Sequence, residues 1–384
     1  MKIVMLTGYF HPHLGGAEKE TKRLALQFRE GKNKIIIICH RYLCSLKQKD
    51  FLDNIPIFRY TTLLLKKRDL FSMILGFPYI LFTVRKFKPD IIYSAFSSIN
   101  LFICLWLKRF LKTPVVSSIR GTDIFRFPKK NVFYKKIIKW NLKNVDMVIP
   151  VAKVAYQEAK KYGDIRKKAK IIQGEVDINK FEITENKSLI NKYQLKNKFV
   201  IMTLCRLSRV KRVDILLRSF KIALSKLKYA PDGREIILMI CGDGEEKGRL
   251  EKISKDLGVS EKTIFTGEIP PDEVPHYLSL ADLYVSTSEY EVFSHTTIEA
   301  MMSGLPIIST NIQAYEDILH GAGLMVPLND PKSLSNAIIN LIKDDKKRKI
   351  MGRDSRKISE NFYSRKDTIN EFLKVFETVI KSKN

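Results

Sequence analysis

The stretch Glu291-Val-Phe-Ser-His-Thr-Thr-Ile-Glu299 runs on into Ala-Met-Met-Ser-Gly304-Leu-Pro306 and combines two carboxylates, a Ser/Thr run and a Gly-Pro stop. In an α/β sheet this pattern indicates a strand end, a turn, and a helix whose N-terminus faces a cleft. Free N–H groups and the helix dipole favour a phosphate there. Glu299 follows Glu291 by about two helical turns. One carboxylate could therefore hold a sugar and the other a ribose, or both could be ordinary surface residues.

Strand-like and helix-like segments alternate along the whole chain, which predicts a parallel α/β architecture. Strands are expected at 2–7, 34–39, 90–94, 114–119 and 146–150, and in a second series at 199–205, 235–241, 263–266, 282–286, 306–309 and 323–326. Helices of the first series are expected at 17–30, 72–87, 99–111, 132–143 and 152–162. A polar segment, 178–197, separates the two series, so we expect two domains, residues 1–180 and 181–365.

Length and composition favour a cytoplasmic globular protein. The 384 residues are too many for one ordinary core, and a hydrophobic content of 45% is that of a globular protein. No uncharged apolar run is long enough to span a membrane, and the N-terminal residues 1–8 resemble a first strand, not a signal peptide. Neither a CxxC motif nor a metal-binding spacing is present, so we expect five reduced cysteines: Cys39, Cys44, Cys104, Cys205 and Cys241.

The net charge of +27 is concentrated in the first half of the chain. Residues 1–180 contain 36 Lys and Arg against 13 Asp and Glu, whereas residues 181–384 contain 32 against 28. A compositional bias towards lysine would raise both halves alike, so the asymmetry favours a polyanionic partner, either nucleic acid or an anionic membrane. The apolar segments 71–87 and 101–112 are bordered by basic residues. They are either core-packing helices or a basic, aromatic face that rests on a membrane.

Two cations follow the first strand of the second series, in Arg206-Leu-Ser-Arg-Val-Lys211. Arg binds phosphate oxygens in a bidentate fork, and Lys supplies a point charge. Arg206 and Lys211 could therefore neutralise a diphosphate leaving group as charge builds on it. A purely structural role is the less favoured alternative, because the helix dipole disfavours cations at a helix start.

Loops after other strands contain further candidates. Arg120-Gly-Thr-Asp123 contains an Arg/Asp pair that could orient an acceptor hydroxyl or simply form a loop ion pair. Gly15 and Gly16 open the first helix and would let the backbone approach a ligand, but the absence of GxGxxG disfavours a dinucleotide site. Two turns could let a flat base lie against the backbone or serve only as turns: Gly242-Asp-Gly244 and Phe265-Thr-Gly267-Glu268.

Taken together and in this order, the motifs resemble the large retaining glycosyltransferase family 4, which has the GT-B fold. The resemblance extends over nearly the whole chain. It includes Gly-Gly-Ala-Glu at 15–18, Arg-Gly-Thr-Asp at 120–123, Gln-Gly-Glu-Val-Asp at 173–177, Arg206 with Lys211, Gly242-Asp-Gly244, and Glu291 to Glu299 with Ala-Met-x-x-Gly-x-Pro after it. The implied fold is two Rossmann-like parallel-sheet domains that face each other across a cleft. The N-terminal domain would bind the acceptor and the C-terminal domain the donor, and a C-terminal helix within 366–384 would cross back to the first domain.

The resemblance also implies roles for individual residues. Arg206 and Lys211 would bind the donor diphosphate. Glu291 would face the donor sugar, and Glu299 would hydrogen-bond the ribose hydroxyls. Asp123 would lie near the acceptor and the donor sugar. The other candidates for donor binding are Gly15, Gly16, Gly242, Gly244, Glu268, Ser294, His295, Thr296 and Thr297. No metal and no bound cofactor are expected, because members of the family generally use a nucleotide sugar without a metal, and no His/Asp ligand cluster is visible in the sequence.

The sequence departs from the family pattern at four places. Val292 stands where the family usually has Gly, which would tighten the sugar pocket. Arg120 stands where many members have His. Glu175 interrupts the linker motif, and the segment 311–316 lacks the common Gly-Gly, which puts contacts from that loop in doubt.

The predicted activity is transfer of a hexosyl group from a nucleoside diphosphate sugar, with a UDP-sugar favoured, to a hydroxyl of a lipid-linked or polysaccharide acceptor. The anomeric configuration would be retained. The basic first half would then dock on an anionic membrane, which places the enzyme in the cytoplasm, peripheral to the cytoplasmic face of that membrane.

Two rival functions remain open. A nucleic-acid-binding protein would explain the charge, but the sequence shows no helix-turn-helix, RNP or zinc-finger signature, so no nucleic-acid partner is expected. Another GT-B enzyme, a sugar-nucleotide epimerase or a phosphorylase, is the second. An epimerase would act on the donor alone, and a phosphorylase would contain pyridoxal phosphate with its own absorbance.

Overall fold

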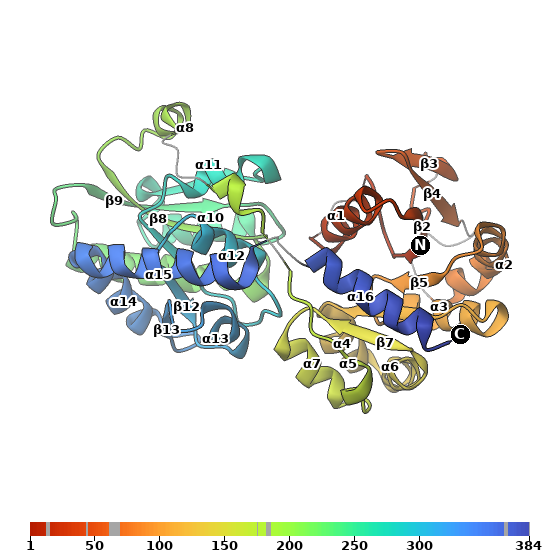
Figure 1. Ribbon diagram of the computed structural model, residues 1–384. Coiled ribbons are helices and arrows are strands. Elements are labelled where there is room, and N and C mark those ends of the chain that lie inside the picture. Colours follow the sequence, from red (N-terminus) through yellow and green to blue (C-terminus); the bar gives the residue numbers. More distant parts are fainter. Residues whose placement is uncertain are drawn as a thin grey trace. The chain divides into compact units, whose positions relative to one another are not determined.

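The computed structural model describes residues 1–12, 16–43, 45–60, 70–174, 176–181, 186–364 and 368–383. The chain folds into two compact units, Met1–Gln173 with Asp367–Asn384, and Gly174–Lys366 (Figure 1). The first unit thus ends before the boundary predicted at residue 180. Val176 pairs with Ser364, and Phe181 is buried in a core of the second unit, so the chain after Gln173 belongs to that unit.

A seven-stranded sheet forms the centre of the first unit within the described residues. Its strands are β1 (Lys2–Leu6), β2 (Lys34–His40), β3 (Lys49–Leu52), β4 (Ile55–Tyr60), β5 (Ile91–Ser94), β6 (Val115–Ile119) and β7 (Met147–Pro150). They lie in the order β3-β4-β2-β1-β5-β6-β7, and all neighbours are parallel except β3 and β4. Parallel pairing requires a crossover between strands, which helices supply except between β2 and β4, where β3 intervenes.

The antiparallel strands β3 and β4 form a hairpin that the sequence-based prediction missed. Asp53 and Asn54 connect the two strands with φ angles of 48° and 61°. Both angles lie in the left-handed region that a tight two-residue hairpin turn requires, and Asp and Asn enter this region more readily than other non-glycine residues. The Asp-Asn pair, which follows Phe-Leu and precedes Ile-Pro-Ile-Phe, was therefore the available signal.

Helices flank the first sheet. They are α1 (Gly16–Glu30), α2 (Leu70–Phe87), α3 (Ile99–Leu111), α4 (Thr122–Phe125), α5 (Phe127–Lys130), α6 (Val132–Asn144), α7 (Lys153–Lys160) and, from the C-terminal end of the chain, α16 (Thr368–Lys381). Phe372 and Phe376 of α16 pack on Phe28 of α1 and Tyr93 of β5, with ring centroids 5.4–6.0 Å apart. These contacts bury one face of α16 in the core of the first unit (Figure 1). The predicted return of the C-terminal helix is confirmed.

The second unit contains a parallel sheet of six strands in its described part. They are β8 (Lys198–Leu204), β9 (Glu235–Cys241), β10 (Thr263–Gly267), β11 (Leu283–Ser286), β12 (Ile307–Thr310) and β13 (Leu324–Val326). Their order is β10-β9-β8-β11-β12-β13, so the chain proceeds outward in one direction from β8 and then starts again on its other side with β11. This arrangement has a topological switch point between β8 and β11.

Two buried cores cover the two faces of the second sheet. Phe199 and Ile201 of β8 point into one core, whereas Val200 and Met202 of the same strand point into the other, as alternation along a strand requires. The helices of this unit are α8 (Lys187–Lys192), α9 (Val213–Lys226), α10 (Lys247–Asp256), α11 (Val274–Leu278), α12 (His295–Met302), α13 (Gln313–Leu319), α14 (Pro331–Lys343) and α15 (Asp345–Tyr363). A sheet buried on both faces explains its near-continuous apolar strands.

The architecture confirms the predicted α/β class with two Rossmann-like parallel-sheet domains. Cys44 lies outside the described residues, and the four described cysteines are free thiols. No helix in the described ranges combines the length and the apolar character that a membrane crossing needs.

Candidate active site

The loops that follow β8 and β11 meet at the switch point of the second sheet. The first loop contains the 3₁₀ turn Arg209–Lys211, and the second leads from Ser286 to α12. The Thr287 hydroxyl donates a hydrogen bond to the Lys211 carbonyl at 2.9 Å, and the Glu289 N–H donates to the Val210 carbonyl at 2.9 Å. Ligands of open α/β sheets bind at this position, so the joined loops form the candidate site.

A buried ion pair lies between these loops. The Lys211 ammonium contacts Glu291 Oε1, and the Ser288 hydroxyl donates to the same oxygen at 3.1 Å. The side chains of Lys211 and Glu291 are only 19% and 12% exposed. Two residues that were predicted to contact different parts of a donor, its diphosphate and its sugar, are thus brought into direct contact.

The ion pair keeps Lys211 in its charged form. Burial by itself acts to lower the pKa of Lys211, but the charge of Glu291 and the hydrogen bond it accepts outweigh this effect, and the net pKa is raised. Nearby, burial raises the pKa of Tyr315 to about 12, and the Glu291 carboxylate acts in the same direction. Lys211 therefore offers a fixed positive charge at neutral pH.

Arg206 occupies a different environment from Lys211. Its side chain is 77% exposed, and its guanidinium pairs with Glu245 at 3.2 Å. Surface pairs of this kind are weak, so little free energy holds the guanidinium on Glu245. The structure does not bring Arg206 and Lys211 into contact, but it leaves Arg206 able to turn towards an anion.

Two positions after β9, Gly242 and Gly244, require glycine for a structural reason that the sequence-based interpretation missed. A Cβ on Gly242, at φ 127°, would lie 2.0 Å from the Cys205 carbonyl oxygen, and one on Gly244, at φ 158°, would lie 2.4 Å from that of Leu207. The space at these positions is filled by the backbone of the β8 loop, not by a planar base. Gly242 and Gly244 thus let two loops of the site pack backbone against backbone.

The N-terminus of α12 follows directly on the Glu291 loop. Ser294 is the N-cap residue, but its side chain makes no capping hydrogen bond; its hydroxyl lies 2.9 Å from that of Thr297. Tyr284 donates to the hydroxyl of Thr296 and to the Leu204 carbonyl, both at 3.2 Å. The Ser294 side chain therefore does not occupy the first N–H groups of α12, and it does not compete with an anion for them.

The remaining predicted residues of α12 differ in exposure. The exposed His295 ring packs edge-on against Phe293, with centroids 5.0 Å apart. A Cβ on Gly174 would lie 2.7 Å from both rings, so the linker passes closely over them. Glu299 is half-buried on the same helix, and Val292 is buried. The effect of Val292 on a sugar pocket stays a prediction.

Comparison with known proteins agrees with this geometry. A family model described as Glycosyltransferase Family 4 matches residues 14–180, and one described as Glycosyl transferases group 1 matches residues 185–358. The two matches together include nearly all of both units. The chain belongs to glycosyltransferase family 4. It is an enzyme, a hexosyltransferase with the GT-B fold.

The individual relatives have low sequence identity to the glycosyltransferase, but their alignments extend over most of its length. An uncharacterized glycosyltransferase of Methanocaldococcus jannaschii is 24% identical over 99% of each chain. The alpha-monoglucosyldiacylglycerol synthase of Streptococcus pneumoniae is 22% identical, over 80% of this chain and 71% of its own. Among solved structures, Anabaena HepE in complex with UDP has a TM-score of 0.78 at 18% identity, covering 100% of this chain and 99% of HepE.

In the first unit of the glycosyltransferase, Asp123 accepts backbone hydrogen bonds that the sequence did not indicate, and its place near the acceptor and the donor sugar stays a prediction. The residue is 1% exposed, and its carboxylate accepts hydrogen bonds from the N–H groups of Ser97 at 2.9 Å, Gly121 at 2.8 Å and Arg120 at 3.2 Å. Burial raises the pKa of Asp123, and the backbone hydrogen bonds oppose this. The Arg120 guanidinium turns away, to the Ala95 carbonyl at 3.1 Å and the Tyr93 hydroxyl at 3.3 Å. The expected Arg/Asp side-chain pair is absent from these described loops, because Asp123 instead ties the loops after β5 and β6 together.

The structure says less about the remaining predicted donor-binding residues, Gly15, Gly16 and Glu268. Gly15 and Glu175 lie outside the described residues, and Gly16 is the first residue of α1. Glu268 is exposed directly after β10. Across the described ranges there is no group of three or more His, Cys, Asp and Glu side chains that could hold a metal ion.

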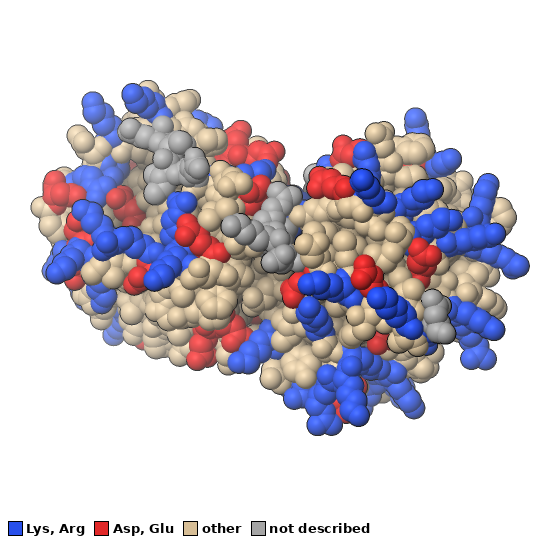
Figure 2. All heavy atoms as spheres, in the orientation of Figure 1, with Lys and Arg blue, Asp and Glu red and all other residues tan. Residues whose placement is uncertain are grey.

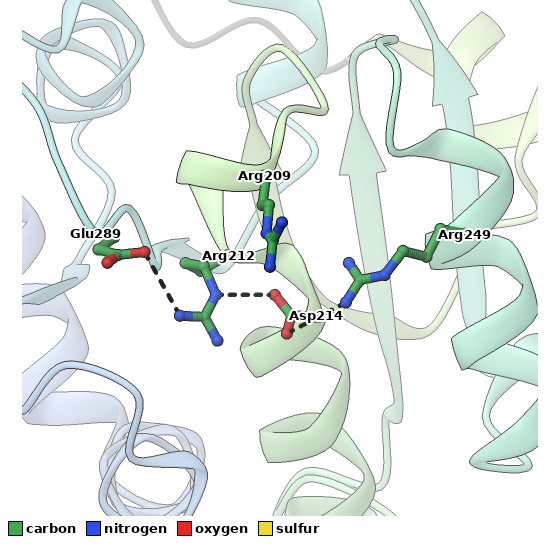
Figure 3. Close-up of a pocket in the computed structure, with 5 residues that line it drawn as sticks. All are labelled: Arg209, Arg212, Asp214, Arg249 and Glu289. Atoms are coloured by element: carbon green, nitrogen blue, oxygen red, sulfur yellow. Dashed lines mark hydrogen bonds and ion pairs between the residues drawn. The ribbon is translucent and has the colours of Figure 1, made fainter. Parts of the chain in front are cut away.

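The glycosyltransferase also has a cavity that the sequence did not indicate, lined in part by residues on either side of Lys211 in the chain. Its volume is about 390 Å³, and its lining is entirely charged: Arg209, Arg212, Asp214, Arg249 and Glu289 (Figure 3). Two of these arginines belong to the β8 loop, one residue on either side of Val210 and Lys211. The run of cations from 206 to 212 was the visible signal, but Arg249 and Glu289 come from distant parts of the chain, whereas Asp214 directly follows the run.

Proposed function

We propose that the enzyme transfers a hexosyl group from a nucleoside diphosphate sugar, most readily a UDP-sugar, to an acceptor hydroxyl with retention of configuration. The observation that carries this proposal is the buried Lys211–Glu291 pair at the switch point of the second sheet. Lys211 supplies a fixed cation for the negative charge of a diphosphate leaving group, and Glu291 supplies a carboxylate that can accept hydrogen bonds from sugar hydroxyls. HepE, with a similar fold, binds UDP.

The proposed chemistry uses the charges at the site. The bond between the anomeric carbon and the diphosphate breaks, and the acceptor oxygen forms its bond on the same face. The acceptor proton passes to the leaving diphosphate oxygen, so no enzyme carboxylate has to act as nucleophile. Lys211 and, once turned from Glu245, Arg206 stabilise the developing negative charge. Glu291 faces the sugar, Glu299 the ribose, and the first N–H groups of α12 the phosphates.

Binding of the donor tests this proposal. We expect the melting temperature to rise with one class among UDP-, GDP- and ADP-sugars, because a ligand at 100 times its Kd stabilises the folded state by about 2.7 kcal/mol. Changing Glu299 to Ala should remove most of the rise, because the ribose loses its acceptor. The measurement is a thermal shift titration against each sugar nucleotide.

The matched control is Glu261→Ala, which removes an exposed carboxylate of the same unit from the 3₁₀ turn Ser260–Lys262. This variant should show the full thermal shift. A protein that responds to none of the sugar nucleotides would contradict the proposed activity. A full response in Glu299→Ala would remove only the ribose assignment.

We further propose that the acceptor is a lipid-linked or polysaccharide hydroxyl reached at an anionic membrane. The relative from Streptococcus pneumoniae is named for synthesis of a diacylglycerol glycolipid. In the present chain, five aromatic rings form a continuous series across α2, α3 and α6, with centroids 5.1–6.0 Å apart. We call the five residues the aromatic face: Phe77, Phe102, Trp106, Phe110 and Trp140.

The aromatic face is exposed and bordered by cations. Trp106, Phe110 and Trp140 are 44%, 57% and 40% exposed, which is unusual for such large apolar side chains. Lys136 and Lys143 lie four residues before and three residues after Trp140 on α6, a spacing that places them beside it, and Arg109 follows Trp106 by three residues on α3. Lys and Arg side chains are also dense over the first unit in the view of Figure 2. Aromatic rings with a basic border fit the interface of an anionic bilayer.

Vesicle binding tests the membrane proposal. We expect co-sedimentation with phosphatidylglycerol-containing vesicles, and weakening as salt is raised, because ionic attraction to the surface is screened. The double variant Trp106→Ser with Phe110→Ser should bind about tenfold more weakly, because two partly exposed rings no longer enter the bilayer.

The control is Tyr229→Ser, which removes a ring that is 57% exposed and belongs to the second unit, whereas the aromatic face belongs to the first. Its binding should equal that of the unchanged protein. Equal binding to neutral and anionic vesicles would contradict an electrostatic dock, and undiminished binding of the double variant would exclude the aromatic face.

A further inference from the structure

We propose that Arg212 is a positioning residue, which holds Lys211 in its contact with Glu291 by means of a second ion bridge between the same two loops. The inference rests on the proposed role of Lys211 in catalysis. Arg212 itself does not touch Glu291; it acts through the loop that carries Lys211.

The contacts of Arg212 connect three segments of the second unit. Its Nε pairs with Asp214 Oδ1 at 3.2 Å, and its Nη1 lies 3.6 Å from Glu289 Oε2 (Figure 3). The same Nη1 donates to the side chain of Asn329, in the segment between β13 and α14. In Figure 3, Arg212 lies between Glu289 and Asp214 at the charged cavity. The guanidinium therefore joins the start of α9 to the loop after β11.

Two ion bridges thus link the loops after β8 and β11. Lys211 and Arg212 are consecutive, and their partners Glu291 and Glu289 are two residues apart. The first bridge is buried, whereas Arg212 and Glu289 are 23% and 53% exposed at the cavity. With the hydrogen bond from Glu289 N–H to the Val210 carbonyl, the two bridges leave the 3₁₀ turn that contains Lys211 little freedom to shift relative to Glu291.

The backbone conformation of Arg212 makes glycine the suitable substitution for a test of its side chain. Its φ and ψ of 48° and 38° lie in the left-handed region, which costs free energy for any residue other than Gly, Asn or Asp. Glycine would satisfy this turn without strain. Arg212→Gly therefore removes the guanidinium without adding backbone strain.

The reactivity of the Lys211 amine in the free protein tests the proposal without a substrate. Limited acylation followed by peptide mass spectrometry reports the rate at each lysine. In the unchanged protein Lys211 should react slowly, since its ammonium is buried and paired. We expect Arg212→Gly, which suits the left-handed backbone, to raise that rate several-fold as the pair loosens. Lys349, 73% exposed on α15, should react equally in all variants.

Two variants distinguish an ion bridge between the loops from a change in the electrostatic field at Lys211. Removing a positive charge would by itself raise the pKa of Lys211 and slow acylation, whereas removing a negative charge would speed it. A bridge predicts faster acylation in both Arg212→Gly and Glu289→Gln. Arg249→Gln is the matched control, because it removes a cation of the same cavity that belongs to α10 and to neither loop. It should not speed acylation. Arg212→Lys should restore part of the protection.

Turnover supplies the second readout. With the sugar nucleotide found by titration, Arg212→Gly should lower kcat about tenfold at little cost in KM, because a displaced catalytic group slows the chemical step more than binding. Unchanged or slower acylation of Lys211 in Arg212→Gly overturns the inference. A protein that turns over no sugar nucleotide overturns the proposed function instead, and the acylation rates still decide the role of Arg212.

Discussion

Turnover is expected to fall by about 100-fold or more when Lys211 is changed to Ala, as for the loss of one preorganised group that meets developing charge. The ammonium is charged, buried and paired with Glu291, so it needs little reorganisation when a diphosphate departs. The measurement is kcat at saturating sugar nucleotide. KM should change less, because the interaction strengthens as the leaving group gains charge.

Controls for Lys211→Ala must distinguish a loss of catalysis from a loss of stability. Without Lys211 the Glu291 carboxylate, 12% exposed, is left buried without its cation, which costs about 3–5 kcal/mol in typical cases. The double variant Lys211→Met with Glu291→Gln removes both charges and should recover the melting temperature but not the turnover. Lys221→Ala, at an exposed position of α9, should leave both unchanged. A folded Lys211→Ala protein with the original kcat would exclude the catalytic role.

The second large effect concerns stability. Changing Gly242 to Ala should lower the free energy of unfolding of the second unit by about 3 kcal/mol or more. The added Cβ would lie 2.0 Å from the Cys205 carbonyl oxygen, and the φ of 127° is unfavourable for any side chain. Cys205 cannot retreat easily, because its N–H donates to the Cys241 carbonyl at 3.0 Å. Urea unfolding followed by far-UV circular dichroism measures the change.

The two tryptophans provide an internal reference for that experiment. Trp106 and Trp140 both belong to the first unit, so tryptophan fluorescence reports on that unit and should move less than the dichroism. Gly248→Ala is the matched control: nothing lies within 4 Å of its Cβ position on α10, so alanine should stabilise the helix by about 0.5–1 kcal/mol. Equal stability of Gly242→Ala and the unchanged protein would show that the two loops can separate freely.

Local patterns in the sequence predicted most of the fold. Apolar runs bounded by turn residues located the strands of both parallel sheets to within a residue or two, and the amphipathic or apolar stretches between them located the longer helices. The hairpin of β3 and β4 escaped because its strands are short and only partly apolar, and because the Asp53–Asn54 turn was not weighed. The start of the second unit was placed too late, because the segment from Gly174 to Phe181 is polar in composition but packs into that unit.

The site was predicted less completely than the fold. Lys211 and Glu291 were each singled out, yet their contact was not expected, because they lie 80 residues apart and meet only through the order of β8 and β11 in the sheet. Asp123 was interpreted as a substrate-facing group, although its oxygens are occupied by three backbone N–H groups. Backbone donors carry no sequence signal, so an Asp of this kind cannot be distinguished from a free one by pattern alone.

By itself, the sequence determined the α/β class, the division into two Rossmann-like halves, the family and the residue types at the candidate site. Strand and helix periodicity, turn residues and motif order are local properties, and they suffice for these conclusions. Only the tertiary structure decided the Lys211–Glu291 pair, the bridge from Arg212 to Glu289, the burial of Asp123 and the close packing at Gly242. Each of these depends on where loops from distant strands meet, and that is set by strand order and by contacts whose free energies no local pattern encodes.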